Sequence, residues 1–509
     1  MGGRWRDGGG PARPLPDATT GETVALLPST GPDPAAALAY ARDVGGPALR
    51  ALTFTQRAAI LKALARHLAA QLDDLVALST RTGATRRDTA VDVDGGIGTL
   101  AVYAGKGARE LPDATVLLDG DAEPLGKGGT FAGQHVYTSR LGAAVQVNAF
   151  NFPVWGMLEK LAPAFLAGMP SVVKPASQTA YLTERVVRHI VESGLLPDGA
   201  LSLWCAGPGG LLDTLTAQDT LSFTGSAATA FALRTHPVVA GRSVRFNAEA
   251  DSLNCAILGP DVRAGDPEFT LYVDQLVTEM TVKAGQKCTA IRRAFVPAAL
   301  AESVTDAVAA RLAATVVGDP GRPDTLVGPL ASLAQRDEVR AAAGRLARVA
   351  KLAFGDPDRV DVSGADAVRG AFLSPLLLRC DDADAAAPHE VEAFGPVCTL
   401  LPYSDVDGVV AAAARGGGSL AGSIVTHDPD VARRLVAGLA SGHGRLLVLD
   451  RDDAAESTGH GIAMPQLLHG GPGRAGGGEE LGGLRAVRHH MHRTAVQGHP
   501  DFLRSLAAT

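Results

Sequence analysis

Cys288 has the side chain and the setting that best suit covalent chemistry. It lies in the segment Glu279–Arg293, which reads EMTVKAGQKCTAIRR. Apolar residues recur with helical spacing over 271–283, the helix is expected to end near Ala284–Lys287, and a strand is expected from Ala294. A thiol between a helix end and a strand can attack a carbonyl carbon, and its backbone N–H can face the oxygen that becomes negative. The alternative is a small, buried hydrophobic side chain.

Two further polar residues follow predicted strands. Asn151, in NAFNFPVW, precedes a helix, so its carboxamide can donate a hydrogen bond to an oxyanion or cap that helix. Glu249, in FNAEADS, ends the predicted strand Arg245–Glu249. A carboxylate that faces an apolar pocket there would have a raised pKa and could accept a proton from water, whereas the alternative is a surface turn residue. Together with Cys288, the two residues would surround a space the size of a carbonyl group.

Lys174 ends another predicted strand and is followed by Pro175. Its cation suits ribose hydroxyls or a phosphate, and the hydroxyl of Ser177 can add a hydrogen bond. A site selective for NAD typically has a carboxylate that holds the ribose diol, but no acidic residue follows Lys174 before Glu184. The sequence therefore favours NADP as the cofactor and leaves NAD possible.

Other residues complete the expected cofactor site. The FTGS segment (223–226) lies at a strand-to-helix junction, where backbone N–H groups and the helix dipole can meet a pyrophosphate. In the segment EAFGP, a glutamate can contact a ribose and a phenylalanine can pack on a ring. Besides Lys174 and Ser177, the candidate cofactor-binding residues are Phe150, Thr224, Gly225, Ser226, Glu392 and Phe394.

Two patterns late in the chain are interpreted as unrelated to the site. A glycine triplet (471, 473 and 476) matches the dinucleotide fingerprint but lies outside the region of alternating strands and helices, so His469–Gly483 is expected to be a flexible loop. Three clustered histidines lack acidic or cysteine neighbours, so no metal site is expected. These are His489, His490 and His492. No histidine stands in a motif that would place a base beside Cys288, which argues against a thiol hydrolase.

The order of the predicted elements places the polar residues at one edge of a sheet. Strands and helices alternate over 141–234, which is typical of βαβ units in a parallel sheet, and such sheets bind ligands beyond the carboxyl ends of their strands. The expected strands are Leu141–Val147, Ser171–Lys174, Leu201–Trp204 and Leu221–Phe223, and the expected helices are Trp155–Ala167, Thr179–Ser193 and Ser226–Arg234. A second α/β half is expected to begin with the strand Arg245–Glu249.

The remaining segments have weaker patterns. Residues 1–20 are expected to form an irregular lead-in rich in glycine and proline, followed by a turn over 17–22. A long helix is expected from Thr55, as its N-cap, to Thr82. A protruding hairpin is expected over Leu117–Tyr137, and a final strand or arm over Leu484–Thr494.

Composition restricts the class of protein. A chain of 509 residues is too long for one core, so two or three domains are expected. The net charge of −7 does not suit a nucleic-acid-binding protein. Five widely spaced cysteines indicate a reducing compartment rather than a disulfide framework. The chain shows no apolar signal sequence and no membrane-spanning stretch, so it is expected to be soluble and cytoplasmic.

Six motifs occur in the order and spacing of the aldehyde dehydrogenase superfamily, which the chain therefore resembles. They are NAFNFP, KPASQT, SFTGSAATA, FNAEADS, GQKCTAIRR and EAFGPV, and the similarity runs from about Trp5 to Gly498. Longer segments resemble one branch: the aldehyde dehydrogenase part of the ring-opening protein of phenylacetic acid catabolism, and its relative that acts on 3,4-dehydroadipyl-CoA semialdehyde. The chain departs from the pattern at Ala230, where many members have glycine. It ends at Thr509, so the hydratase domain of the bifunctional proteins is not expected.

The resemblance implies an α/β architecture in three parts. They are a Rossmann-like cofactor-binding domain (1–120 and 141–247), an α/β catalytic domain (248–470) and a β oligomerisation arm (121–140 and 484–509). The arm implies a homo-oligomer, a dimer or larger.

The resemblance also implies a reaction. Cys288 would be the nucleophile, the Asn151 amide and the Cys288 N–H would hold the oxyanion, and Glu249 would activate water. The implied reaction is the NAD(P)-dependent oxidation of an aldehyde to a carboxylic acid, on a CoA-linked semialdehyde from phenylacetate ring cleavage and usually with NADP. The alternatives are 3,4-dehydroadipyl-CoA semialdehyde from benzoyl-CoA catabolism, a CoA-acylating enzyme, against which Glu249 argues, and a non-catalytic dinucleotide-binding protein.

Overall fold

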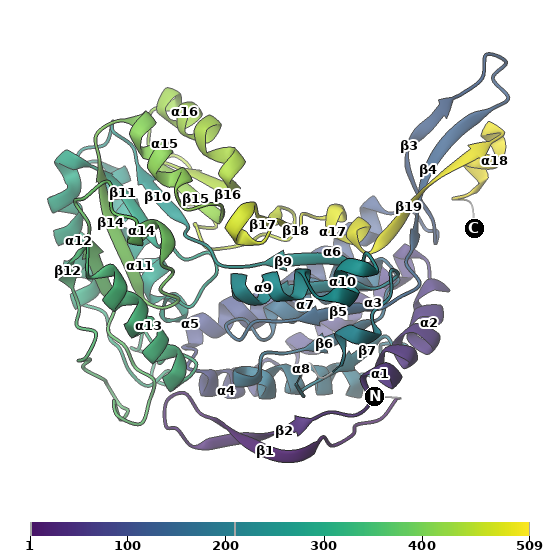
Figure 1. Ribbon diagram of the computed structural model, residues 1–509, viewed down its shortest axis with the longest axis horizontal. Helices are drawn as coiled ribbons and strands as arrows, with labels where there is room; N and C mark the ends of the chain where they lie inside the picture. The colour runs from purple at the N-terminus through teal and green to yellow at the C-terminus, as the bar shows by residue number, and fades with distance from the viewer. Residues whose placement is uncertain (1–2, 208–209, 508–509) are drawn as a thin grey trace.

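The computed structural model describes residues 3–207 and 210–507, which form two α/β lobes side by side and a projecting arm (Figure 1). The first lobe contains a five-stranded parallel sheet with the order β7-β6-β5-β8-β9. In that order the strands are Leu201–Leu203, Ser171–Lys174, Ala144–Val147, Thr220–Thr224 and Arg245–Glu249. The predicted parallel sheet is confirmed. The assignment of Arg245–Glu249 to the second half was wrong, because β9 pairs with β8.

Helices cover both faces of this sheet because adjacent residues of a buried strand point to opposite sides. In β6, Val173 packs in one core with α3, α7 and α8, while Val172 packs in another with α1. The helices of this lobe are α1 (Pro34–Tyr40), α2 (Gly46–Arg50), α3 (Phe54–Ala69), α4 (Leu72–Ser79), α5 (Arg86–Thr89), α6 (Gly95–Glu110), α7 (Trp155–Leu166), α8 (Ala180–Glu192), α9 (Ala227–Arg234) and α10 (Pro237–Gly241).

The start of α3 differs from the prediction. Thr53, not Thr55, is the N-cap: its hydroxyl accepts from the N–H of Gln56, and the Gln56 side chain accepts from the N–H of Thr53. This reciprocal capping satisfies two N–H groups that a helix start otherwise leaves unpaired. The expected single helix to Thr82 is also interrupted, because α3 ends at Ala69 and α4 begins at Leu72.

The second lobe contains a seven-stranded sheet with the order β12-β13-β14-β11-β10-β15-β16, which is parallel except for β12. In that order the strands are Lys351–Phe354, Leu376–Arg379, Val397–Tyr403, Arg293–Pro297, Cys255–Leu258, Ser419–Val425 and His443–Leu449. One core packs against α11 (Pro267–Thr281) and α12 (Ala301–Ala313), and the other against α13 (Leu333–Leu346), α15 (Val406–Ala414) and α16 (Pro429–Leu439). The short α14 (Ala387–Glu390) precedes β14.

The first residues form a hairpin rather than an irregular lead-in. Strand β1 (Gly9–Pro16) pairs with β2 (Thr23–Thr30) in antiparallel register. The predicted turn between them is confirmed, since the N–H of Asp17 donates to the carbonyl of Glu22 at 2.7 Å. The hairpin extends along the lower edge of the molecule in the view of Figure 1.

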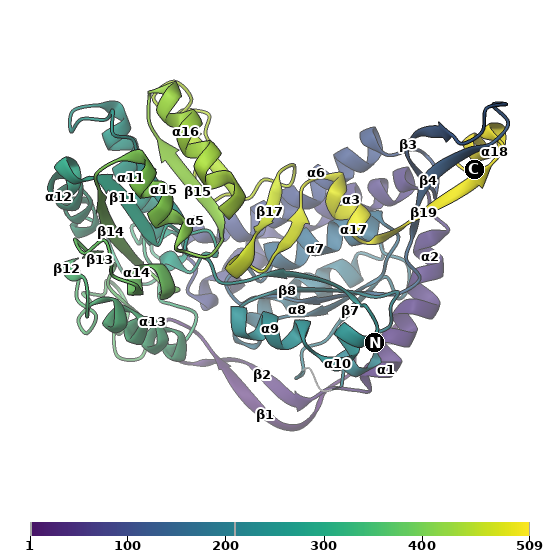
Figure 2. The same ribbon diagram turned by 45° about the horizontal axis from the view of Figure 1, so that its top comes forward.

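The arm consists of β3 (Leu117–Pro124), β4 (Ala132–Ser139) and β19 (Met491–Gly498), in the order β19-β4-β3, followed by α18 (Pro500–Ser505). It extends away from both lobes (Figures 1 and 2). The predicted hairpin over Leu117–Tyr137 is confirmed. The prediction for Leu484–Thr494 is correct only in part, because α17 (Leu484–His489) precedes the strand.

The glycine-rich segment forms a hairpin where the prediction was a flexible loop. Strand β17 (Leu468–Gly471) pairs with β18 (Gly478–Leu481), and the pair lies between the lobes (Figure 2). A Cβ on Gly470, whose φ is +146°, would lie 2.1 Å from the carbonyl oxygen of Gly478. A Cβ on Gly478 would lie 2.3 Å from Oδ1 of Asn247, in β9. These glycines therefore permit close backbone packing rather than mobility.

Within the described part of the chain, no helix is long and apolar enough to cross a membrane.

Candidate active site

The segment that carries Cys288 is held in an unusual backbone conformation. After α11 ends at Thr281, three successive residues have positive φ: Lys283 (56°), Ala284 (50°) and Gly285 (66°). Two of them are not glycine, so the conformation is strained, as it often is at functional sites. A Cβ on Gly285 would lie 2.2 Å from the carbonyl oxygen of Gly395. Helix α11 thus ends earlier than the predicted end near Ala284–Lys287, and only a 3-10 turn (Val282–Gly285), which packs against Gly395, continues to that point.

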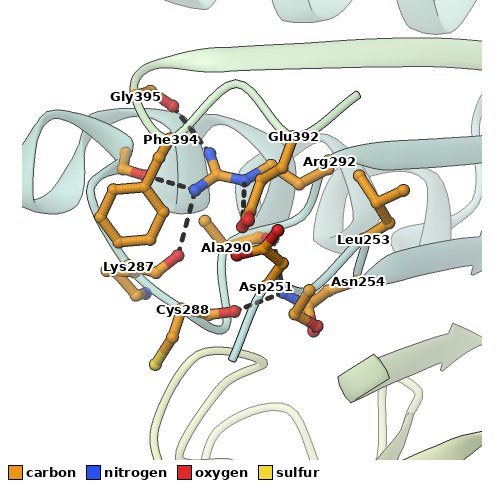
Figure 3. A network of polar contacts seen from close by, with 12 residues as sticks. Asp251, Leu253, Asn254, Lys287, Cys288, Ala290, Arg292, Glu392, Phe394 and Gly395 are labelled. Atoms are coloured by element: carbon orange, nitrogen blue, oxygen red, sulfur yellow. Dashed lines mark hydrogen bonds and ion pairs between the residues drawn. The ribbon is translucent and has the colours of Figure 1, made fainter. Parts of the chain in front are cut away.

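A buried arginine fixes the same segment from behind. Arg292 donates to the carbonyls of Gly285 at 2.9 Å, Lys287 at 3.1 Å and Gly395 at 2.7 Å. Asn254 donates to the carbonyl of Cys288 at 2.8 Å. Figure 3 shows the Cys288 side chain pointing away from this network. The network therefore positions the backbone and leaves the sulfur free to face the cleft.

The three predicted catalytic residues share one cleft. A cleft of about 700 Å³ is lined by Asn151, Glu249 and Cys288, together with residues of both lobes. Asn151 follows β5, Glu249 is the last residue of β9, and Cys288 lies between α11 and β11. The structure thus brings together side chains that are far apart in the sequence, and the sulfur does not point into packed hydrocarbon.

Asn151 is not the cap of the helix that follows it. Nδ2 of Asn151 donates to the carbonyl of Gln286 at 2.9 Å, whereas Oδ1 of Asp92 accepts from the N–H groups of Val154 and Trp155 at the start of α7. The second amide hydrogen of Asn151 stays available for a ligand. The Cys288 N–H makes no hydrogen bond to any described residue.

Glu249 is buried, with 1% exposure, so the alternative of a surface turn residue is excluded. Neither of its carboxylate oxygens has a hydrogen-bond partner among the described residues. Nε2 of His469 lies 3.4 Å from Oε2. Burying a carboxylate without a hydrogen bond costs free energy. A bound molecule that donates a hydrogen bond to Glu249 would remove that cost.

His469, in β17, is the residue that the sequence did not predict. Its Nε2 lies 4.0 Å from Sγ of Cys288, and its Nδ1 lies 3.2 Å from Oε2 of Glu159. Its ring stacks on Trp155 with 5.7 Å between ring centroids. The prediction that no histidine lies beside Cys288 was therefore wrong. Lys160 completes the chain of contacts, 2.9 Å from Oε1 of Glu159.

Burial raises the pKa of the Cys288 thiol well above its usual value, and the charge of Glu249 raises it further. Lys287 opposes this effect only weakly, and its ammonium is paired with both oxygens of Glu279 at 2.8 Å. The net effect disfavours the thiolate in the absence of a ligand. Burial lowers the pKa of His469, but Glu249 and Glu159 raise it more, so the net shift is upward. Burial also opposes ionisation of Glu159, yet Lys160 and His469 bring its pKa down to about 2.

The candidate cofactor residues divide into two groups. Six line the cleft: Phe150, Thr224, Gly225, Ser226, Glu392 and Phe394. Lys174 and Ser177 do not line it. Two residues beside them in the chain, Ala176 and Gln178, do line it. Lys174 has a pKa lowered by burial, and its Nζ lies 3.5 Å from the carbonyl of Pro175.

The cleft offers polar groups that lack partners. Both side-chain polar atoms of Asn148, Oγ1 of Thr224 and Oε1 of Glu392 are buried without a hydrogen bond to a described residue. Burial raises the pKa of Glu392 to about 7, although Arg292, 3.9 Å away, lowers it. Phe394 packs edge-on to Phe150 with centroids 5.9 Å apart. Unpaired polar atoms beside aromatic rings fit a dinucleotide, whose rings need packing and whose ribose and amide groups need hydrogen bonds.

The end of β8 leads directly into α9. Ser226 caps that helix by accepting from the N–H of Thr229, and Gly225 donates from its N–H to the carbonyl of Glu249. A Cβ on Gly225 would lie 2.6 Å from the ring of Phe223, so glycine is required there. Ala230, the departure noted in the sequence, is buried in α9 against Phe223 and Ala248.

Comparisons with known proteins agree with this geometry. A model described as "Aldehyde dehydrogenase family" matches residues 5–458. The chain is 48% identical over 473 residues, 92% of this chain and 92% of the other, to 3,4-dehydroadipyl-CoA semialdehyde dehydrogenase from Aromatoleum evansii. It is also 48% identical over 182 residues to protein MaoC from Klebsiella aerogenes, which is 35% of this chain and 52% of that protein. The structure of PnpE in complex with nicotinamide adenine dinucleotide superposes with a TM-score of 0.85 at 22% identity, over 98% of this chain and 97% of the other.

Proposed function

The chain belongs to the aldehyde dehydrogenase family, as its six motifs predicted, and we propose that it oxidises the aldehyde of a CoA-linked semialdehyde to a carboxylic acid. The observation that carries the proposal is the convergence of Asn151, Glu249 and Cys288 on one cleft. The overall change is aldehyde plus water plus oxidised cofactor to carboxylate, reduced cofactor and two protons. NADP is the proposed cofactor, with NAD as the alternative.

The first step is addition of Cys288 to the aldehyde carbon. The thiol has a raised pKa, so it must lose its proton to a neighbouring base as it attacks, and the proposed base is His469, whose Nε2 lies 4.0 Å from Sγ. The carbon–sulfur bond forms while the carbonyl oxygen takes the electron pair. The free amide hydrogen of Asn151 and the unpaired N–H of Cys288 are the donors for that oxyanion.

A nicotinamide cofactor, when bound, would supply the hydride acceptor. Thr224, Glu392 and Phe394 would hold the dinucleotide, since they line the cleft with unpaired polar atoms or an aromatic ring. Lys174 and Ser177, at the end of β6, are proposed to contact the adenosine ribose and its phosphate. The cation of Lys174 is the feature that favours NADP.

Glu249 then acts as the base for hydrolysis of the acyl-enzyme. Its carboxylate takes a proton from water, the oxygen attacks the acyl carbon, and the carbon–sulfur bond breaks to release the carboxylic acid and Cys288. A buried carboxylate with no hydrogen-bond partner suits this role, because a water molecule would be its first donor.

Two CoA-linked semialdehydes are candidates for the natural substrate. The motifs resemble those of enzymes for the semialdehyde of phenylacetate ring cleavage, whereas the relative aligned over 92% of both chains is named for 3,4-dehydroadipyl-CoA semialdehyde. Steady-state kinetics with each semialdehyde, each with NADP and NAD, decides between them. Equal kcat/KM for both and for a short free aldehyde would contradict a CoA-linked substrate.

The contact between Cys288 and His469 supports a second candidate function, a thiol hydrolase that needs no cofactor. Such an enzyme would cleave an activated ester or a thioester through the same acyl-cysteine. Hydrolysis of a CoA thioester without NAD or NADP, at a rate matching aldehyde oxidation, would favour it.

The arm is proposed to pair subunits into a dimer or a larger homo-oligomer. Its sheet has β3 and β19 at the edges, and neither has a second partner strand among the described residues. Exposed edges of this kind are templates for pairing between chains. Light scattering of the whole protein measures the state, and a monomer at micromolar concentration would refute the proposal.

A further inference from the structure

We propose that Cys288, Glu249 and His469 form a binding site for Zn²⁺, whose occupation blocks the nucleophile. Their ligand atoms, one sulfur, one carboxylate oxygen and one ring nitrogen, all lie within 4.8 Å of one another. Thiolate, imidazole and carboxylate are the three side-chain ligands that zinc uses. The inference goes beyond the proposed oxidation and concerns the same cleft.

The separations of the ligand atoms match a tetrahedral zinc site. Zinc bonds of about 2.3 Å to sulfur and about 2.1 Å to nitrogen or oxygen place tetrahedral S and N ligands about 3.6 Å apart, and N and O ligands about 3.4 Å apart. Nε2 of His469 lies 3.4 Å from Oε2 of Glu249 and 4.0 Å from Sγ of Cys288. The Nε2–Sγ distance is thus ~0.4 Å longer than in a tetrahedral site, and Sγ and the Glu249 oxygen lie within 4.8 Å of each other. Three protein ligands leave the fourth position for water or a ligand in the cleft.

The support behind His469 is of the kind that metal-binding histidines have. Nδ1 faces Oε2 of Glu159 at 3.2 Å, Lys160 holds the other oxygen of that carboxylate at 2.9 Å, and Trp155 stacks on the ring. A carboxylate at Nδ1 fixes the proton there and leaves the Nε2 lone pair directed at the metal. Nε2 is the nitrogen that faces Glu249 and Cys288.

The unpaired carboxylate of Glu249 is a second observation that points to a ligand at this site. It is 1% exposed, faces the cleft and has no hydrogen bond to a described residue. Zinc binding would convert the Cys288 thiol to a thiolate and release one proton to solvent. The cation would then be balanced by the thiolate and by the Glu249 carboxylate. Arg445 opposes the cation electrostatically, but it donates to the carbonyl of His460 at 2.9 Å and is not a ligand.

The test is metal binding to the full-length protein without aldehyde or cofactor. Equilibrium dialysis against Zn²⁺ should give one equivalent of metal that depends on the cluster, and Co²⁺ should give the intense near-ultraviolet absorption of a thiolate–cobalt bond. His469→Asn should lose that absorption. Glu159→Gln, which removes the support and keeps all three ligands, should weaken Zn²⁺ binding about 10- to 100-fold.

A second histidine–carboxylate cluster supplies the matched control. His427, Asp450 and Asp452 also come within metal-binding distance, but the site is largely exposed. His427→Asn should leave the thiolate–cobalt absorption unchanged. Absence of that absorption in the wild-type protein, or Zn²⁺ affinity of folded His469→Asn and Glu159→Gln equal to wild type, would overturn the proposal.

The two proposals fail separately. A protein that oxidises aldehydes without the cobalt signature refutes only the zinc site, whereas a protein with the signature and no aldehyde oxidation refutes only the proposed function. Reversible loss of aldehyde oxidation on Zn²⁺ addition, restored by a chelator, is the expected activity counterpart in the wild type. Loss that a chelator does not reverse would contradict it.

Discussion

Replacement of Asn151 by alanine isolates the oxyanion site. In the proposed mechanism Asn151 contributes one of two donors, its free amide hydrogen, while the second donor is the unpaired N–H of Cys288. Removal of one such donor costs about 3 to 4 kcal/mol of transition-state stabilisation, or about 10²- to 10³-fold in rate. The same change also leaves the carbonyl of Gln286 without its 2.9 Å donor, which costs about 1 to 3 kcal/mol of folding free energy. Rate and stability must therefore be measured together.

Single-turnover kinetics is the assay, with enzyme in excess over aldehyde and cofactor saturating, followed by absorbance of the reduced cofactor. Thr179→Val is the matched control. The Thr179 hydroxyl donates to the carbonyl of Phe150, the residue before Asn151, at 2.9 Å, so this variant also removes a hydrogen bond that holds the loop. Loss of that bond should cost about 1 kcal/mol and less than about tenfold in rate. Urea unfolding of both variants measures the structural contribution.

Equal rate losses in Asn151→Ala and Thr179→Val would refute the oxyanion role of Asn151. A rate loss in Asn151→Ala that is explained by its unfolded fraction would also refute that role. A donor to the transition state changes the rate of the chemical step even when the variant is fully folded.

Three further outcomes follow from the site. Cys288→Ala should abolish aldehyde-dependent cofactor reduction, because the proposed nucleophile is lost. Cofactor affinity, measured by fluorescence titration, should stay within about threefold of wild type, because the sulfur is not proposed to contact the cofactor. Residual turnover would contradict the nucleophile role. Burial raises the pKa of Glu392 to about 7, so the folded state binds its proton more tightly than the unfolded state does. The free energy of unfolding should therefore fall by about 2.5 kcal/mol as pH rises from 5 to 8. Glu392→Gln should remove that dependence in urea unfolding at the two pH values, and an unchanged slope would exclude Glu392 as its origin. Lys174→Ala should raise the KM for NADP by about 10- to 100-fold, as loss of a charge-assisted hydrogen bond would, and the KM for NAD by less; equal increases would remove Lys174 from cofactor discrimination.

The parallel sheet was predictable because its signals are local. Strands β6 and β9 coincide with the predicted segments, since a short buried run bounded by polar or turn residues identifies a strand without tertiary information. The position of Glu249 at the carboxyl end of β9 follows from that boundary. The sequence motifs around Asn151 and Cys288 likewise identified residues that the fold brings into one cleft.

His469 could not be predicted because its significance depends on tertiary contacts. It is 181 residues from Cys288, and the glycines around it read as a flexible segment. Their positive φ values and close contacts allow β17 and β18 to pack against β9. One signal was present: Glu159 and Lys160 are adjacent charges in α7, whose other residues are largely apolar and buried. Buried charges require partners, and His469 is a partner of Glu159.

The start of α3 was misassigned because several threonines compete for the cap. Thr53 and Thr55 both precede the apolar stripe, and only the reciprocal bond with Gln56 selects Thr53. Thr55 caps no N–H group of a described residue; its hydroxyl, like that of Thr53, donates to Asp113, a contact that lies outside the local pattern.

The most direct test of the central claim is rapid mixing of Glu249→Gln with aldehyde and cofactor. If Cys288 forms an acyl-enzyme that Glu249 helps to hydrolyse, this variant should give a burst of one reduced cofactor per active site, then almost no turnover. Mass spectrometry should find the acyl group on Cys288. A steady rate matching wild type, or a burst with no added mass on Cys288, would contradict the account.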